Sequence, residues 1–287
     1  MKLKQRLKNK QALVVPACFD MVSAKVIENC GFEAIYHSGF GHSASHLGFP
    51  DTGLMSFSEM LERLHNLVRT VNIPVLADAD TGFGGIVNIR RTVQEYEWAG
   101  AQAIQLEDQH IPKKCGHTAG KQLINAPEMT RKLEAAVAAR KNDDFLIIAR
   151  TDAIAVTGID DAIARGKLYQ EAGADIIFVE APSTIEQIKR IGGSFNKPVM
   201  LNQIERGKTP LLPIRDLQSL GFKIIAYALT ALMASVWAME RTLTKLKNQA
   251  EPSEYLNDIA TFEDIDQLLN FPEWRLWEKR FQHNVKR

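Results

Sequence analysis

Short runs of apolar residues recur along the chain, separated by longer segments in which apolar residues follow helical spacing. The runs lack the alternation of polar and apolar residues that marks a half-exposed strand, and they are typical of parallel strands buried on both faces. The pattern therefore predicts eight βα units. The predicted strands lie near 12–19, 34–38, 75–80, 103–107, 146–151, 176–180, 199–203 and 223–228.

An internal repeat supports this prediction. A glycine followed by a strand-like run occurs four times, in CGFEAIYHSG, AGAQAIQLED, AGADIIFVEA and LGFKIIAYA. Each copy follows a helical stretch, where a helix C-terminus favours a residue that tolerates positive φ. A second kind of strand entry alternates with the first, in NIPVLADAD, NDDFLIIARTD and NKPVMLNQ. Such repetition indicates one supersecondary unit used many times.

Eight βα units favour a (βα)8 TIM barrel over an open doubly wound sheet, since no glycine-rich dinucleotide motif follows the first predicted strand. We expect residues 1–250 to form the catalytic barrel, with its eighth helix around 230–247. Residues 251–287 form a predicted helical extension that contains FEDIDQLLNFPEWRLWEKRF. The apolar face of this extension should pack on the barrel or on a neighbouring subunit.

Composition narrows the class of protein. The chain has 287 residues and a formal net charge of +1, without a long run of one charge sign, which argues against nucleic-acid and membrane-surface binding. No window approaches the roughly 20 apolar residues of a membrane span. The basic N-terminus precedes a short apolar run interrupted by Pro16, which we interpret as a strand rather than a signal peptide.

The three cysteines follow no metal-finger spacing and are odd in number, so the sequence predicts neither a disulfide framework nor a zinc site. A reducing cytoplasm fits this usage best. Cys18 and Cys30 lie among apolar residues and are expected to be buried. Cys115 differs, because it lies in a polar, basic segment.

Polar residues gather at the predicted carboxyl ends of the strands, where TIM barrels build their active sites. They are Tyr36, Ser38, Asp78, Asp80, Glu107, Asp108, Arg150, Asp152, Glu180 and Asn202, with Asp51 in the loop after the second strand. Each carboxylate alone could be a helix cap or half of an ion pair. Together they would repel one another strongly unless a cation lay among them.

Oxygen ligands without a histidine or thiolate cluster favour Mg²⁺, or Mn²⁺, over zinc. We expect Asp78 and Asp80 nearest the metal, with Glu107 holding its water ligands. Arg150 offers a planar pair of donors for a substrate carboxylate. The predicted site therefore suits a small oxyacid chelated to Mg²⁺.

The segment HIPKKCGHTAGKQ, residues 110–122, is long for a βα connection and contains Lys113, Lys114, Cys115, Gly116 and His117. Long polar loops over a barrel mouth are commonly lids. The alternative is a solvated surface loop with an incidental thiol. If the loop is a lid, the flanking cations are expected to lower the pKa of Cys115, which suits a nucleophile or a proton donor.

Several of these motifs resemble the isocitrate lyase and phosphoenolpyruvate mutase superfamily. The likeness covers nearly the whole chain and follows the family's order in AIYHSGF, LGFPDTG, VLADADTGFG, QLEDQHIPKKCGH, IARTDA, FVEAP and NQIERGKTP. It implies a (βα)8 barrel whose eighth helix is exchanged between subunits, a homotetramer built as a dimer of dimers, and a Mg²⁺-dependent reaction at a C–C or C–P bond. The cysteine of the CGH motif is similar to that of the lyase branch.

The resemblance also implies residue roles. Asp78, Asp80 and Glu107 correspond to the metal site. Residues that would bind substrate are Ser38, Gly39, Phe40, Asp51, Gly116, His117, Arg150, Glu180 and Asn202. Cys115 would protonate a carbanion, with Arg150 as a catalytic partner and Tyr36 as a candidate group beside the substrate hydroxyl.

The implied reaction is a retro-aldol, Claisen-type cleavage of a 2-hydroxy dicarboxylate of the substituted malate type, which yields a 2-oxo acid such as pyruvate and a carboxylate. The motifs FVEAP and NQIERGKTP are most similar to the dimethylmalate lyase and oxaloacetate-cleaving branch. Met233 stands where methylisocitrate lyases carry an arginine for a third carboxylate. The alternatives are 2-methylisocitrate lyase, oxaloacetate decarboxylase or hydrolase, carboxyvinyl-carboxyphosphonate phosphonomutase, and a binding module without activity.

Overall fold

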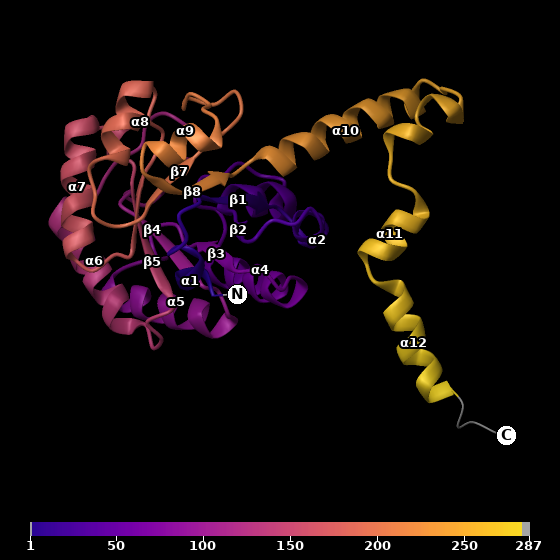
Figure 1. The fold of residues 1–287 in the computed structure, drawn as a ribbon, viewed down its shortest axis with the longest axis horizontal. Coiled ribbons are helices and arrows are strands. Elements are labelled where there is room, and N and C mark those ends of the chain that lie inside the picture. Colours follow the sequence, from indigo (N-terminus) through magenta and orange to yellow (C-terminus); the bar gives the residue numbers. More distant parts are fainter. Residues whose placement is uncertain (1, 283–287) are drawn as a thin grey trace. The chain divides into compact units, whose positions relative to one another are not determined.

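The computed structural model describes residues 2–282. The chain forms two compact units that divide between Leu232 and Met233. In the first unit, parallel strands close into a barrel in chain order, with β8 hydrogen-bonded to β1 (Figure 1). The strands are β1 (Leu13–Cys18), β2 (Ile35–His37), β3 (Val75–Asp78), β4 (Ala103–Glu107), β5 (Leu146–Thr151), β6 (Ile176–Val179), β7 (Val199–Asn202) and β8 (Phe222–Tyr227). The predicted strands and the predicted TIM barrel are confirmed.

Helices between the strands surround the barrel (Figure 1). The longer ones are α2 (Met21–Asn29), α4 (Phe57–Thr70), α5 (Ile86–Ala99), α6 (Ala126–Ala139), α7 (Ile159–Glu171) and α8 (Ile185–Gly192), with α9 (Ile214–Ser219) before β8. Short helical turns are α1 (Leu3–Arg6), α3 (Gly39–His42), the π-helix η1 (Ser43–Leu47) and η2 (Ala153–Ala155). The predicted eighth helix is α10 (Thr230–Lys247).

Local signals set the helix ends. Ser56 caps α4 by accepting a hydrogen bond from the Glu59 N–H, while the Glu59 carboxylate accepts one from the Ser56 N–H, which satisfies two otherwise unpaired donors. Asn125 caps α6, with a proline in its first turn. Gly100 ends α5 with φ 98°, a conformation that glycine adopts without a steric penalty.

The core has two layers, which explains the apolar runs. Side chains such as Leu76, Ile148 and Phe178 fill the inside of the barrel, and their strand neighbours, such as Ala77 and Ile147, pack against the helices. Successive residues of a strand point to opposite faces, so this alternation continues to the strand ends. It turns Tyr36, Asp78, Glu107, Arg150, Glu180 and Asn202 toward the barrel mouth.

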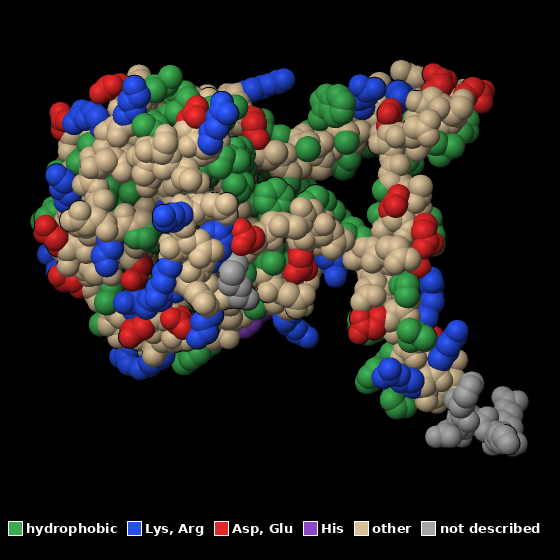
Figure 2. Space-filling model, viewed as in Figure 1, with side chains coloured by type: hydrophobic (Ala, Val, Ile, Leu, Met, Phe, Trp, Pro, Cys, Tyr) green, Lys and Arg blue, Asp and Glu red, His purple; other side chains and the backbone are tan. Residues whose placement is uncertain are grey.

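The second unit contains most of α10, followed by η3 (Pro252–Glu254), η4 (Leu256–Asp258), α11 (Phe262–Leu268) and α12 (Phe271–Gln282). Asp266, which is buried, accepts two hydrogen bonds from Arg275, at 2.9 and 2.8 Å. Large apolar side chains are exposed along this unit, where Figure 2 shows several hydrophobic patches. Trp237, Phe262 and Trp274 are among the exposed residues. Such surface is characteristic of an interface.

Two further observations bear on the sequence predictions. Within residues 2–282, no helix is long and apolar enough to cross a membrane. Cys18 is buried as expected, but Cys30 is exposed. The expectation for Cys30 was wrong because this residue forms the C-cap of α2, where the apolar pattern of the helix ends at the surface.

Candidate active site

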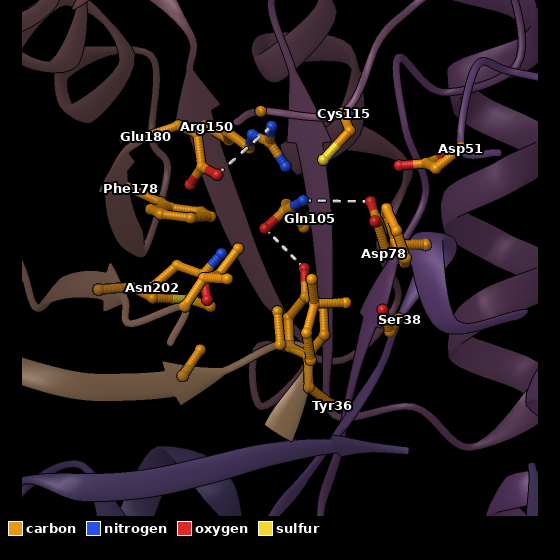
Figure 3. A pocket seen from close by; sticks show the side chains of 17 residues that line it. Tyr36, Ser38, Asp51, Asp78, Gln105, Cys115, Arg150, Phe178, Glu180 and Asn202 are labelled. Carbon is orange, nitrogen blue, oxygen red and sulfur yellow. Dashed lines mark hydrogen bonds and ion pairs between the residues drawn. The ribbon is translucent and has the colours of Figure 1, made fainter. Parts of the chain in front are cut away.

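A pocket opens at the carboxyl ends of the strands and encloses about 500 Å³ of space, part of it open to solvent (Figure 3). Ten of the residues predicted for the site line this pocket: Tyr36, Ser38, Phe40, Asp51, Asp78, Cys115, Gly116, Arg150, Glu180 and Asn202. The remaining four are Gly39, Asp80, Glu107 and His117, and each contacts a lining residue. The structure thus brings the predicted residues together.

Asp78 lies at the end of β3 and is held by three donors. Its Oδ1 accepts hydrogen bonds from the Asp80 N–H and from Gln105 Nε2, each at 3.1 Å. Its Oδ2 accepts one from the Gly39 N–H at 3.3 Å. A Cβ at Gly39 would lie 2.8 Å from Asp78 Oδ2, so this close approach of backbone to carboxylate requires glycine.

Asp80 and Glu107 are buried carboxylates beside Asp78. Burial raises the pKa of Asp80 to about 6, with Lys113 opposing the shift and Asp78 adding to it. Burial also raises the pKa of Glu107 well above its usual value, although Arg150 opposes this. Oε1 of Glu107 is buried and has no hydrogen-bond partner among the described residues. A hard divalent cation would stabilise the charged form of these buried carboxylates. It would also bind the Glu107 oxygen that lacks a hydrogen-bond donor.

The three predicted metal residues do not form a complete coordination shell. Within residues 2–282, no three acidic, histidine or cysteine side chains converge closely enough to hold a metal by themselves. Mg²⁺ usually keeps several waters and binds only one or two carboxylates directly. If Asp78, Asp80 and Glu107 hold Mg²⁺, water and substrate oxygens would have to complete its coordination.

The cation that lies among these carboxylates in the structure is Lys113. Its buried ammonium is 2.5 Å from Asp51 Oδ1 and 2.7 Å from Asp80 Oδ1. Burial alone would lower the pKa of Lys113, but Asp80, Asp51, Glu107 and Asp78 together hold it well above the ordinary value. The sequence indicated Lys113 only as a cation of the loop beside Cys115, and its position in the acidic cluster is new.

Arg150 connects the two sides of the pocket. Its guanidinium donates from Nε and Nη2 to the two oxygens of Asp152, at 2.9 and 3.0 Å. It also lies 3.4 Å from Glu107 and 3.9 Å from Glu180. This network fixes the guanidinium at the pocket wall, where a substrate carboxylate can reach it.

Asp108, which the sequence placed among the polar strand ends, has a structural role and does not line the pocket. It follows the inward-facing Glu107 and therefore points outward, toward the helices. There it accepts hydrogen bonds from Thr151 Oγ1 at 2.7 Å, Tyr169 Oη at 2.8 Å and Arg165 Nη1 at 3.2 Å. These contacts tie β4 and β5 to α7.

Tyr36 and Gln105 form a buried hydrogen bond at the centre of the pocket (Figure 3). Because Asp78 only accepts, Gln105 directs its amide nitrogen to Asp78 and its oxygen to Tyr36, whose O–H donates at 2.6 Å. Burial raises the pKa of Tyr36 well above 10, and Asp78 adds to this. Gln105 was missed because it lies between apolar Ile104 and Leu106; its two-residue spacing from Glu107 was the available signal.

Cys115 lies at the pocket with its sulfur directed inward (Figure 3). Burial raises the pKa of its thiol, the His117 backbone opposes this, and Asp51 and Glu180 add to the increase. The expected lowering of this pKa by flanking cations was wrong, because the effect of burial on the thiol outweighs them. The thiol therefore stays protonated near neutral pH, which suits a proton donor.

The rest of the CGH motif packs against the pocket wall. A Cβ at Gly116 would overlap the Glu180 carboxylate and the Arg150 guanidinium. His117 Nδ1 accepts a hydrogen bond from the Lys208 N–H at 3.1 Å, so in the neutral ring Nε2 carries the proton and faces Glu180 Oε1 at 3.5 Å. Burial lowers the pKa of His117, which favours this neutral form.

The opposite wall is largely apolar. It is formed by Phe178, Met200, Ile204, Ala226, Ala228 and Leu229. Asn202 Oδ1 and Glu180 Oε2 lie beside it, buried and without hydrogen-bond partners among the described residues. The pocket thus combines acceptors for a hydroxyl, an arginine for a carboxylate and an apolar surface for alkyl groups.

Comparison with known proteins supports the resemblance seen in the sequence. Residues 3–247 match the family model described as phosphoenolpyruvate phosphomutase. The chain is 44% identical to 2,3-dimethylmalate lyase of Eubacterium barkeri over 98% of this chain and 97% of the relative. It is 37% identical to 2-methylisocitrate lyase of Halalkalibacterium halodurans, over 99% and 94% of the two chains.

Solved structures give the same picture. A 2,3-dimethylmalate lyase in a trigonal crystal form matches with a TM-score of 0.90 at 32% identity, covering 98% of this chain and 94% of that one. A phosphonopyruvate hydrolase in complex with oxalate and Mg²⁺ matches with a TM-score of 0.88 at 33% identity, covering 97% of each chain.

Proposed function

The chain belongs to the phosphoenolpyruvate mutase and isocitrate lyase superfamily, and we propose that it is a Mg²⁺-dependent carbon–carbon lyase acting on a substituted malate. The observation that carries this proposal is the position of the Cys115 thiol, which faces a pocket with a carboxylate cluster on one side and an apolar wall on the other. A small oxyacid that becomes a carbanion needs such an acid beside it.

Each end of the substrate has residues suited to hold it. The Arg150 guanidinium, with Ser38, Gly39 and Phe40 at the end of β2, would bind carboxylate groups. Glu180 and Asn202 offer buried acceptors for a substrate hydroxyl. Asp78, Asp80 and Glu107 would hold Mg²⁺, with Asp51 close to its waters. When bound, Mg²⁺ would supply a Lewis acid that lowers the pKa of the substrate hydroxyl.

The proposed reaction breaks the bond between the hydroxyl-bearing carbon and its neighbour. The hydroxyl loses its proton to a base, its carbon becomes the carbonyl of a 2-oxo acid such as pyruvate, and the bonding electrons pass to the carbon beside the second carboxylate. Cys115 gives its proton to that carbanion and completes the carboxylate product. Tyr36 lies beside the reacting groups, but its own proton is directed to Gln105, so it orients the hydroxyl as a hydrogen-bond acceptor.

The pocket favours a dicarboxylate with alkyl substituents. Among the residues that line it, Arg150 is the only lysine or arginine, and the far wall offers no cation for a third carboxylate. Phe178, Met200 and Leu229 instead present apolar surface that methyl groups can bury. The two relatives described above are lyases of a dimethylmalate and a methylisocitrate, and this wall favours the first kind of substrate.

The test is a substrate panel with the purified full chain and Mg²⁺, Mn²⁺ or EDTA. 2,3-Dimethylmalate and 2-methylmalate should release pyruvate in the presence of metal, faster than methylisocitrate releases it, and malates with a longer 2-alkyl group should release the correspondingly longer 2-oxo acid. Oxaloacetate as the preferred substrate would identify a hydrolase or decarboxylase, and a ³¹P shift with a phosphonate would identify a phosphonomutase. Binding of oxalate with Mg²⁺ but no turnover of any compound would show a binding module and exclude the lyase.

We also propose that the protein is a cytoplasmic homotetramer built from exchanged helices. Residues 1–250 would form the catalytic barrel and residues 251–287 an extension that packs on a neighbouring subunit. The exposed Trp237, Phe262 and Trp274 support an interface along α10–α12. Light scattering should give the mass of an oligomer for the full chain and a smaller species after deletion of residues 251–287. A monomer in both cases would exclude helix exchange.

A further inference from the structure

The base of the loop formed by residues 110–122 is fixed independently of its tip. The His110 N–H donates to the Gln122 carbonyl at 2.7 Å, and Gln109 forms an antiparallel bridge with Leu123. The side chain of Gln109 also donates to the Lys114 carbonyl and accepts from the Lys114 N–H, at 2.7 and 2.9 Å. The two ends of the loop are therefore tied together, and Gln109 also holds Lys114, the residue before Cys115.

Lys121 reaches from this base to the tip. Its side chain is 1% exposed, and its ammonium donates to the Gly116 carbonyl and to Asp152 Oδ1, the latter at 2.8 Å. Asp152 in turn receives both hydrogen bonds of the Arg150 guanidinium. One buried ammonium thus connects the residue after Cys115 to the end of β5.

At Gly116, only the backbone is available for the contact with Lys121. Gly116 lies so close to Arg150 and Glu180 that no side chain fits there, so its carbonyl is the group through which the tip can be held against the pocket wall. The other contacts of the tip have different partners: His117 accepts a hydrogen bond from the Lys208 N–H in the loop after β7, and the Lys113 ammonium binds Asp51 and Asp80. Loss of Lys121 would free the link to β5 and leave the base of the loop intact.

We infer that Lys121 is a positioning residue that holds the loop closed, so that the Cys115 thiol stays next to Arg150 at the reacting carbon. The inference rests on the proposed function only for the identity of that carbon. The closed position of the thiol can be measured without substrate or metal.

The experiment measures how fast DTNB modifies Cys115. The exposed Cys30 is first replaced in a Cys30→Ser parent, which leaves Cys115 and the buried Cys18 as thiols. Lys121→Met in this parent removes the ammonium and keeps a side chain of similar length. Arg150 still binds Asp152 in this variant, so the buried carboxylate keeps a cation. Lys114→Met is the matched control, because the hydrogen bonds recorded for Lys114 are made by its backbone.

We expect Lys121→Met to raise the modification rate of Cys115 by about tenfold or more, because losing a hydrogen bond from a charged donor shifts a local opening equilibrium by that order. Cys18 should stay unreactive, and Lys114→Met should match the parent. Where the parent turns over a substrate, kcat should fall by a larger factor than KM changes, since the acid rather than the binding groups is displaced.

An unchanged Cys115 rate in Lys121→Met would overturn the inference, as would modification of Cys18 at the same rate, which would indicate general loosening. If Lys121→Met does not fold, Lys121→Gln retains a neutral donor and should give an intermediate Cys115 rate; a rate equal to the parent would again refute the inference. Because the thiol assay needs no turnover, an inactive parent would contradict the proposed function and leave this result standing.

Discussion

The Lys113 ammonium lies 2.7 Å from Asp80 Oδ1, and both side chains are buried. The loop of residues 110–122 thus delivers a positive charge to the carboxylates that the proposed Mg²⁺ would bind. Since Asp51 also contacts this ammonium, the position of the loop and the neutralisation of the acidic cluster depend on the same contacts. The loop and the metal site are therefore expected to influence each other.

Replacing Lys113 by Met should destabilise the metal-free protein by about 3 to 5 kcal/mol, the usual effect of removing one partner of a buried ion pair. Mg²⁺ should then raise the melting temperature of Lys113→Met more than that of the wild type, because the ion replaces the lost charge. Thermal unfolding with EDTA and with Mg²⁺ measures both effects. Equal Mg²⁺ shifts in the two proteins would show that Lys113 does not share the carboxylates with the metal.

Cys115→Ser should keep the fold and lose turnover by about 100-fold or more, the usual contribution of a positioned general acid. A hydroxyl is a much weaker acid than a thiol, so it cannot supply the proton at neutral pH. Steady-state kinetics and circular dichroism together test this expectation, with Cys30→Ser as the control that should retain full activity. Wild-type rates in Cys115→Ser would remove the thiol from the mechanism.

Gly116→Ala should reduce turnover by about 100-fold, because a misplacement of about 1 Å in a reacting group has that effect. The added methyl would overlap Glu180 and Arg150 and push the loop outward. Gly85→Ala is a suitable control, since a Cβ there meets no atom within 4 Å and its φ is −82°. Activity of Gly116→Ala within twofold of the control would show that the loop tip can shift without consequence.

The sequence predicted the barrel well because buried parallel strands leave a direct pattern of short apolar runs. It also predicted the pocket residues, because alternation along a strand fixes which end residues face inward. It did not predict the partners of Lys113 or the raised pKa of Cys115. Both depend on the path of the loop, which is set by contacts distant in sequence, such as those of Lys121 with Asp152 and of His117 with Lys208.

The last prediction concerns two buried histidines behind the pocket, His37 on β2 and His42 on α3. Their rings are in contact at a tilt of 41°, with centroids 4.2 Å apart, and their side-chain nitrogens have no hydrogen-bond partners among the described residues. Burial lowers the pKa of His42 from 6.5 to about 4, with the charge of Arg63 adding to this and the Phe19 backbone and Asp20 opposing it. Burial likewise lowers the pKa of His37, to which His42 and Arg63 contribute.

A histidine with a folded pKa below its unfolded pKa binds protons more readily in the unfolded chain. Above pH 6.5 such a histidine does not change the free energy of unfolding. As the pH falls toward 4, it lowers that free energy progressively. At about 1.4 kcal/mol per pKa unit, His42 alone should lower the free energy of unfolding by about 3 kcal/mol at pH 4. Buried carboxylates with raised pKa values act in the opposite direction, so the comparison must be made between variants.

His42→Phe removes the titrating group and keeps a ring of similar size. Its free energy of unfolding relative to wild type, measured with urea, should therefore increase by about 3 kcal/mol between pH 7.5 and pH 4. His65→Phe, on the exposed side of α4, controls for the loss of a surface histidine and should show no such change. A pH-independent difference between His42→Phe and wild type would mean that His42 titrates normally, and that water reaches the ring in the folded protein.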